Sequence, residues 1–324
     1  MRLLGVELSR LLSRRAVVLL LLGAVLLTVL VTGLTAWSTR PVDDAGRAAA
    51  RAELADRLAQ PDVVRDLRLC REDPAQLLGP GATAQECERA VAPTLESYLA
   101  RPELDLAEAI GAVHLPVTLM LLAILTVVGA TFAGSDWSTR SMANQLLFEP
   151  RRTRVWTAKA VAVTLAAGLV TLVLLAGLWL TLSLVATSRG VETTAGVQDQ
   201  IRWAVARASV LAAATTLGSY ALTMLLRSTV ATLGTLFAYV VGGEALLSVL
   251  PLDRPGRWSP SASVFAWLQD GLRLFDRDLG CPAGAPGCTG EYTVTLGHAA
   301  GYLAVLLAVT LTVSLVAFRR RDVP

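Results

Sequence analysis

The chain has 324 residues, of which 54% are hydrophobic and 17% are charged, and its mean hydropathy is +0.55. This much apolar content, gathered in long uninterrupted blocks, excludes a water-soluble single domain. The net charge of +3 is small, and 28 Arg accompany one Lys without a dense basic tract, so the composition predicts no nucleic-acid partner.

Six apolar runs are long enough to cross a hydrocarbon layer of about 30 Å, which takes roughly 20 residues of helix. They are Ala16–Trp37, Ala109–Ser135, Ala160–Ser188, Ala208–Leu226, Ser228–Leu252 and Tyr292–Phe318. Hydrocarbon offers no water to pair with backbone groups, and the alternating pattern of barrel strands is absent, so each run is predicted to be a helix. The sequence therefore predicts an all-α, polytopic membrane protein with six transmembrane helices in one domain over residues 1–324.

Residues 1–15, ahead of the first run, form a predicted amphipathic helix on the membrane surface. Its apolar stripe consists of Leu4, Leu8, Leu11 and Leu12. We expect Glu7, Arg10 and Arg14 to turn away from this stripe. A cleavable signal peptide is the alternative for the first span, but the apolar run exceeds the about 7 to 15 residues of a signal core, and no clear small-x-small cleavage site follows it.

Basic residues beside the span ends predict the orientation. With a cytoplasmic N-terminus, the inner side holds 13 basic residues, against 7 outside once the long segment after the first span is set aside. Segments beyond about 60 residues cross a membrane largely regardless of their charge. An even number of spans then places both termini in the cytoplasm of a multi-pass protein of the bacterial plasma membrane.

The four cysteines fall as two pairs in segments assigned to the outside. Residues 39–108 are polar and helix-forming and are predicted to build an extracytoplasmic helical cap that contains Cys70 and Cys87, while Cys281 and Cys288 lie in the second outer loop, 251–291. Disulfides persist in oxidising compartments, which favours two disulfides. Zinc binding is the alternative, but the spacings lack a C-x-x-C or a nearby His.

The inner segment 136–157, between the second and third spans, predicts a protein contact. A short helix is expected over 141–148, and Pro150 ends it. The exposed apolar and charged tip consists of Leu146, Leu147, Phe148, Glu149, Pro150, Arg151 and Arg152. An apolar patch flanked by arginines is typical of a docking surface. Positive-inside anchoring alone accounts for at least half of the arginines, but not for Leu-Leu-Phe-Glu-Pro.

This segment resembles the permease subunit of type-2 ABC transporters, particularly actinobacterial members. The residues that carry the likeness are Gly134-Ser135-Asp136-Trp137, Leu146-Leu147-Phe148-Glu149-Pro150-Arg151-Arg152, Arg154 and Ala158-Lys159. The resemblance implies that residues 136–157 hold the coupling helix that docks on a separate ATP-binding subunit, that residues 1–15 are the elbow helix, and that a second permease copy or a paralogue completes the transporter. It implies an exporter.

The chain lacks the loop with which ATPases hold phosphate. No G-x-x-x-x-G-K-[ST] occurs, and the single lysine, Lys159, lies between two alanines. We therefore expect no catalytic residue, metal or cofactor in this chain, and ATP with Mg²⁺ in the partner subunit. A membrane enzyme is disfavoured further because neither H-E-x-x-H nor G-x-S-x-G is present. An ion-coupled secondary transporter, or a membrane protein that transports nothing, remains the alternative.

Three ionisable residues share a predicted depth near the outer surface: His114, Glu244 and His298. Glu244 is the only carboxylate within a predicted span, which is thin support for ion coupling. We hypothesise that Glu244 and one imidazole form an outer gate whose closure depends on pH near 6.5. The alternative is that each group separately meets headgroups and water.

Overall fold

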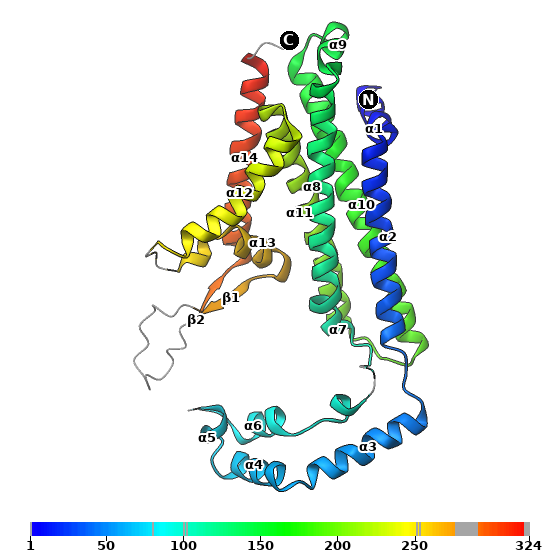
Figure 1. The fold of residues 1–324 in the computed structure, drawn as a ribbon, viewed down its shortest axis with the longest axis vertical. Coiled ribbons are helices and arrows are strands. Elements are labelled where there is room, and N and C mark those ends of the chain that lie inside the picture. Colours follow the sequence, from blue (N-terminus) through cyan, green and yellow to red (C-terminus); the bar gives the residue numbers. More distant parts are fainter. Residues whose placement is uncertain are drawn as a thin grey trace.

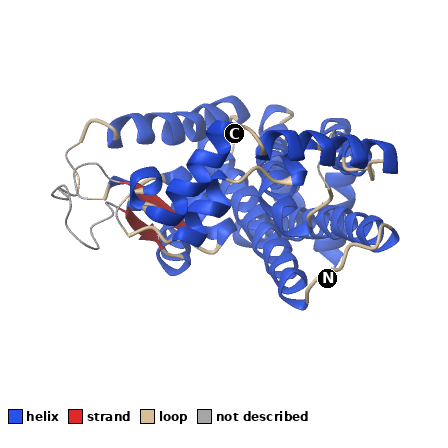
Figure 2. Cartoon of the chain, turned by 90° about the horizontal axis from the view of Figure 1, so that it is seen from below, coloured by secondary structure: helices blue, strands red, loops and turns tan. Residues whose placement is uncertain are grey.

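The structure is a computed structural model that describes residues 2–79, 81–99, 101, 103–250, 252, 254–275 and 291–320. Helices dominate this part of the chain (Figure 1). In chain order they are α1 (Arg2–Ser13), α2 (Arg15–Ser38), α3 (Asp44–Leu58), α4 (Pro61–Glu72), α5 (Ala75–Leu78), α6 (Ala84–Val91), α7 (Leu106–Ala109), α8 (Leu115–Ser138), α9 (Ser141–Phe148), α10 (Arg152–Ser188), α11 (Ala195–Leu226), α12 (Thr229–Leu247), α13 (Pro260–Gln269) and α14 (Leu296–Arg320). Two strands, β1 (Leu272–Phe275) and β2 (Glu291–Val294), pair antiparallel at one edge of the molecule (Figure 2).

Six helical stretches are long and apolar enough to cross a membrane, as the sequence predicted. They are α2, α7 continued through a π-helical turn into α8, α10, α11, α12 and α14. The helices α10 and α11 begin 8 and 13 residues before the predicted apolar runs, at Arg152 and Ala195, because a helix continues into polar residues where hydropathy no longer marks it. The last run is corrected at its start, since Tyr292 belongs to β2.

The centre of the bundle is formed by α8 and α11, which pack along each other; α11 also packs against α10 and α14, and α8 against α2. Their close approach depends on Gly129, where a Cβ atom would lie 2.5 Å from the carbonyl oxygen of Thr216. Ser219 closes the same interface by donating a hydrogen bond of 2.8 Å to the carbonyl oxygen of Thr126. Small residues at such crossings let helix backbones meet directly.

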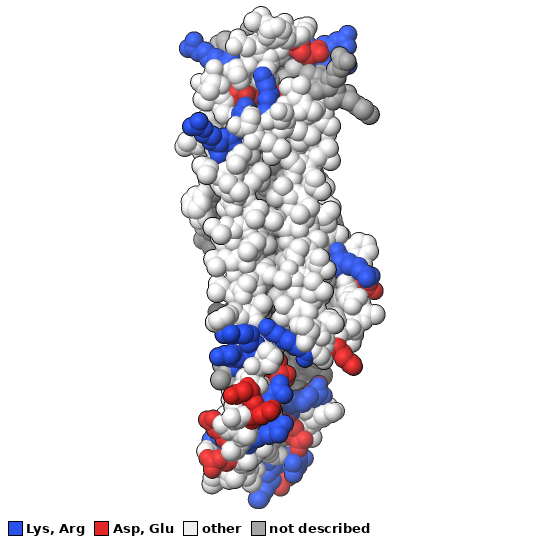
Figure 3. Space-filling view, turned by 90° about the vertical axis from the view of Figure 1, so that its right-hand side faces the viewer, with Lys and Arg blue, Asp and Glu red and all other residues white. Residues whose placement is uncertain are grey.

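Charged side chains gather toward the two ends of the molecule, with a largely uncharged surface between them (Figure 3). One end carries α1, α9 and the C-terminal turn of α14, and the opposite end carries α3 to α6 (Figure 1). We call these the α9 end and the α3 end. An apolar band between two charged ends is the surface that a lipid bilayer requires.

The segment between the first two spans is helical, as predicted. The helices α4 and α6 pack against each other and are joined by a disulfide between Cys70 and Cys87, whose Cα atoms lie 5.3 Å apart. Both cysteine side chains are fully buried. A covalent link of this kind supports a segment too small to form a large apolar core. The predicted second pair, Cys281 and Cys288, lies outside the described residues.

The second predicted outer loop is more structured than the sequence indicated. It contains α13, which packs against α14, and the β1–β2 hairpin. Trp267 is partly buried, and its indole N–H donates to the carbonyl oxygen of Arg207 over 2.9 Å. The described fold is thus helical with one two-stranded sheet, which is a small correction to the all-α prediction.

Candidate functional site: the α9 tip and the charge cluster beneath it

The short helix α9 spans residues 141–148, the range that the sequence predicted. The chain turns into it at Arg140, whose φ of 55° lies in the left-handed region. It ends at Glu149 because Pro150 follows, which has no N–H to donate and restricts the residue before it. The next helix, α10, begins two residues later at Arg152.

The predicted contact residues divide into an outward and an inward set. The side chains of Leu147 and Phe148 are 80% and 91% exposed, the latter being the most exposed large apolar side chain in the described chain. Leu146 instead packs against the core, as does the buried Met142. The exposed apolar surface, which we call the α9 tip, is therefore Leu147 and Phe148.

The charged residues that follow the α9 tip are held by local contacts. Glu149 and Arg154 form an ion pair at 3.4 Å. The guanidinium of Arg152 donates a hydrogen bond of 3.4 Å to the carbonyl oxygen of Phe318 at the end of α14. Pro150 and Arg151 are exposed. These contacts hold the α9–α10 turn in place without covering its apolar side chains.

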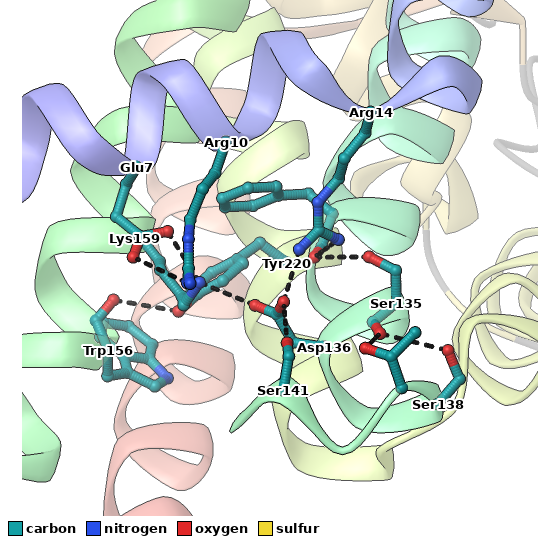
Figure 4. Close-up of polar contacts among 12 residues, drawn as sticks. Glu7, Arg10, Arg14, Ser135, Asp136, Ser138, Ser141, Trp156, Lys159 and Tyr220 are labelled. Atoms are coloured by element: carbon teal, nitrogen blue, oxygen red, sulfur yellow. Dashed lines mark hydrogen bonds and ion pairs between the residues drawn. The ribbon is translucent and has the colours of Figure 1, made fainter. Parts of the chain in front are cut away.

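Beneath α9 lies a buried charge cluster, which we define as Glu7, Arg14, Asp136 and Lys159 (Figure 4). The ammonium group of Lys159 lies 2.7 Å from a carboxylate oxygen of Glu7 and 2.7 Å from one of Asp136. The other oxygen of Asp136 pairs with Arg14, which also donates to the carbonyl oxygen of Phe132 over 2.8 Å. The cluster thus joins α1, the start of α2, the end of α8 and the start of α10.

Charge balance is what allows this cluster to be buried. The two carboxylates of the cluster face its two cations, while the more exposed Arg10 lies 3.8 Å from Glu7 at the edge. The Phe132 ring has the Arg14 guanidinium and the Lys159 ammonium each 5.0 Å from its centroid. A buried ion pays a desolvation penalty that only close opposite charge and further hydrogen bonds offset. Tyr220 completes the surroundings: its hydroxyl donates to the carbonyl oxygen of Trp156 over 3.0 Å.

The cluster is connected to α9 through one side chain. The hydroxyl of Ser141, the first residue of α9, donates to Asp136 over 2.8 Å (Figure 4). A displacement of α9 therefore acts on Asp136, and through Lys159 on α1 and α10. These contacts link α9 to α8, α1 and α10.

The position of Glu7 differs from the one predicted. It was expected to turn away from the apolar stripe of α1, but only 5% of the residue is exposed. Glu7 precedes the buried Leu11 by one helical turn, so the two share a face, and that spacing was visible in the sequence. Leu12, which was assigned to the stripe, is instead 58% exposed.

The predicted outer gate is not assembled as a contact between Glu244 and an imidazole. Glu244 accepts hydrogen bonds from Ser259, at 2.6 Å, and from the backbone and side chain of Ser261, so it caps the first turn of α13. The buried ring of His114 accepts from the indole N–H of Trp179. His298 instead hydrogen-bonds a backbone carbonyl oxygen, that of Arg257, over 2.8 Å. Each group has its own partner because α12, the π-helical turn before α8, and α14 present them to different neighbours.

No protein-family model matches the chain, and no curated protein matches its sequence. The class that the fold defines is a multi-pass helical membrane protein with six candidate spans.

Proposed function

We propose that this chain is the membrane-spanning permease subunit of an ATP-driven ABC transporter of the type-2 class, acting as an exporter. The observation that carries the proposal is the α9 tip, where two large apolar side chains stand exposed directly above a buried charge cluster. An exposed apolar patch of this kind is typical of a protein contact. The partner is a separate ATP-binding subunit, which supplies ATP hydrolysis and Mg²⁺.

The charge distribution supports an orientation with the α9 end in the cytoplasm. Arginines follow α9 and end α14, and Arg15 and Arg227 lie beside span ends at the same level. Cytoplasmic segments carry such an excess of basic residues. In the bacterial plasma membrane this orientation places α3 to α6 outside, where the Cys70–Cys87 disulfide is stable.

A second copy of the chain, or a paralogue, packs against the exposed face of α12. Only 6% of the residues in the apolar window of α12 are buried, compared with 50% for the span that contains α8. Small residues recur every fourth position on α12, at Gly234, Ala238 and Gly242, and nothing lies within 4 Å of where a Cβ would stand at either glycine. Such a face suits close packing of two transmembrane helices.

The coupling proposal is tested by co-purification with the cognate ATP-binding subunit. Leu147→Asp/Phe148→Asp is expected to reduce recovery of the partner at least tenfold, because two charges replace the apolar contact. The matched control is Leu77→Asp/Leu78→Asp, which makes the same change at two neighbouring, exposed leucines of the α3 end. Equal recovery for both double variants would refute the assignment of the α9 tip.

The second copy is tested by disulfide cross-linking of a cysteine placed at Ala238. Oxidation in membranes is expected to give a covalent dimer, whereas a cysteine at Leu169, 61% exposed on α10, is expected to give none. Cross-linking at both positions, or at neither, would argue against a dimer through α12.

The charge cluster also supports a second candidate, an ion-coupled transporter, because buried ionisable groups serve ion coupling in membrane proteins. The cluster is, however, charge-balanced and located at the end of α8. Reconstituted transport separates the two: an ABC transporter requires ATP and its partner and continues when a proton ionophore is added. Transport that the ionophore abolishes, in the absence of nucleotide, would favour the second candidate.

A further inference from the structure

A pocket of about 750 Å³ opens at the α9 end between the starts of α2 and α12 and the last two turns of α8. Its walls meet closely at Gly134, where an added side chain would collide with Thr229 of α12. The pocket is separate from the α9 tip. It lies where the charged end of the molecule meets the apolar band, since Arg15 begins the first span and Arg227 separates the fourth span from the fifth.

The lining of the pocket is cationic. Arg14, Arg15 and Arg227 line it, and no Asp or Glu is among the described residues that do so. Arg14 is compensated by Asp136 within the buried charge cluster. Arg15 is exposed, and the guanidinium of Arg227 is positioned 4.6 Å from the ring centroid of Trp137. The lining of the pocket therefore carries a net positive charge, and the Trp137 ring holds the Arg227 guanidinium in position.

Hydroxyl groups surround these cations. Ser138 and Thr139 come from the end of α8, and Ser228 and Thr229 from the start of α12. Their oxygens can accept or donate hydrogen bonds. Arginines together with hydroxyls are the groups that recognise a phosphate.

Apolar surface continues from the pocket toward the centre of the apolar band. Leu19 and Leu22 follow Arg15 along the same face of α2 and are 68% and 58% exposed. On α12, Val230 is 82% exposed and Phe237, two turns further, is 68% exposed. A ligand that fits both the cationic pocket and the apolar surface beside it has an anionic headgroup and an apolar tail.

We propose that this pocket binds the phosphate headgroup of an anionic membrane lipid from the leaflet at the α9 end, with the acyl chains lying along the exposed face of α2 and past Val230 at the start of α12. Basic pockets between transmembrane helices recognise anionic headgroups in this way. The inference needs only that the protein resides in a membrane, so it stands apart from the proposed ATP-binding partner.

The test is native mass spectrometry of the full chain in detergent, with equimolar dioleoylphosphatidylglycerol and dioleoylphosphatidylcholine. The wild-type protein is expected to retain phosphatidylglycerol preferentially. Each arginine beside an anionic surface contributes a factor of about five, so Arg15→Gln is expected to weaken retention about fivefold and Arg15→Gln/Arg227→Gln about 25-fold. Arg320→Gln, which removes the same charge from the α9 end outside the pocket, is expected to change nothing.

Two further measurements test the same site. Arg15→Lys/Arg227→Lys preserves charge and should preserve the preference, and if the double glutamine variant does not fold, the exposed Arg15 alone decides the result. Equal retention of the two lipids, or equal losses in Arg15→Gln and Arg320→Gln, would overturn the proposal. Displacement of phosphatidylglycerol by equimolar glycerol 3-phosphate would show a site for a free phosphate and refute the lipid.

Discussion

Replacing Lys159 with methionine is expected to destabilise the protein by about 3–5 kcal/mol, which is the cost of removing one partner from a buried ion pair. The structural basis is that Lys159 is 0% exposed and lies 2.7 Å from both Glu7 and Asp136. Methionine fills a similar volume, so little of the loss comes from a cavity. The loss comes from two carboxylates that remain buried without their shared cation.

The measurement is unfolding of the purified chain in mixed micelles, followed by tryptophan fluorescence as the denaturing detergent is increased. The sequence supplies 7 Trp, and two of them, Trp137 and Trp156, lie near the cluster. The matched control is Arg202→Met, which breaks the ion pair with Asp199, whose two side chains are 72% and 63% exposed. An exposed pair contributes about 0–1 kcal/mol, so this variant should unfold almost like the wild type.

A double-mutant cycle isolates the interaction. Lys159→Met, Asp136→Asn and the combined variant should be non-additive by roughly 1–3 kcal/mol, because residues in direct contact share their interaction energy. Additive effects, or a Lys159→Met variant within about 0.5 kcal/mol of the wild type, would show that the two groups do not pair in the folded protein. The charge cluster could then not connect α9 to the bundle.

Three other changes test separate contacts. Arg189→Ala is expected to destabilise the protein by about 1–2 kcal/mol, because the Arg189 guanidinium hydrogen-bonds carbonyl oxygens at the C-terminal end of α2 at 2.6 and 2.7 Å. Arg189→Lys should recover part of this lost stability. If Arg189→Ala is as stable as the wild type, Arg189 does not cap α2. Glu244→Ala removes the acceptor for the Ser261 N–H and is expected to increase hydrogen exchange in the first turn of α13 about tenfold, with Glu244→Gln intermediate; unchanged exchange would refute the assignment. Hydrogen bonds from the backbone N–H of Thr83 and then from its hydroxyl lower the pKa of Glu86 below 4.5. These bonds therefore stabilise α6 fully above pH 4.5, and the stabilisation is lost as the pH falls through the lowered pKa of Glu86. Limited proteolysis of the α3 end should therefore accelerate below pH 4.5 in the wild type and show a smaller change in Glu86→Gln; identical pH profiles would contradict the contact.

Much of the fold was predictable because helices that can span a membrane are recognisable from their local composition. The lengths of six apolar runs decide how many helices can span a bilayer, and the structure contains six of that kind. The end of α9 was likewise local, since a proline cannot continue the interior of a helix. The strands β1 and β2 were not predictable in this way. Each has only four residues, and an alternating pattern of that length cannot be distinguished from a loop.

The candidate site was only half predictable. The α9 tip was named in advance, but Leu146 was grouped with Leu147 and Phe148, although it packs inward. Which apolar side chain of a short helix is exposed depends on what the helix lies against. The three outer-gate residues have separate partners for a related reason: a shared depth in the membrane does not determine which helix neighbours which.

By itself, the sequence determined the number of spans, the helical segment between the first two, and the short helix that carries the α9 tip. Each follows from residues within one or two turns of one another. Only the tertiary structure decided that Glu7 and Lys159, 152 residues apart in sequence, share a buried ion pair. It also decided that Glu244 caps α13 and that α12 is left largely uncovered, because burial and pairing of a side chain depend on helices that meet across the bundle.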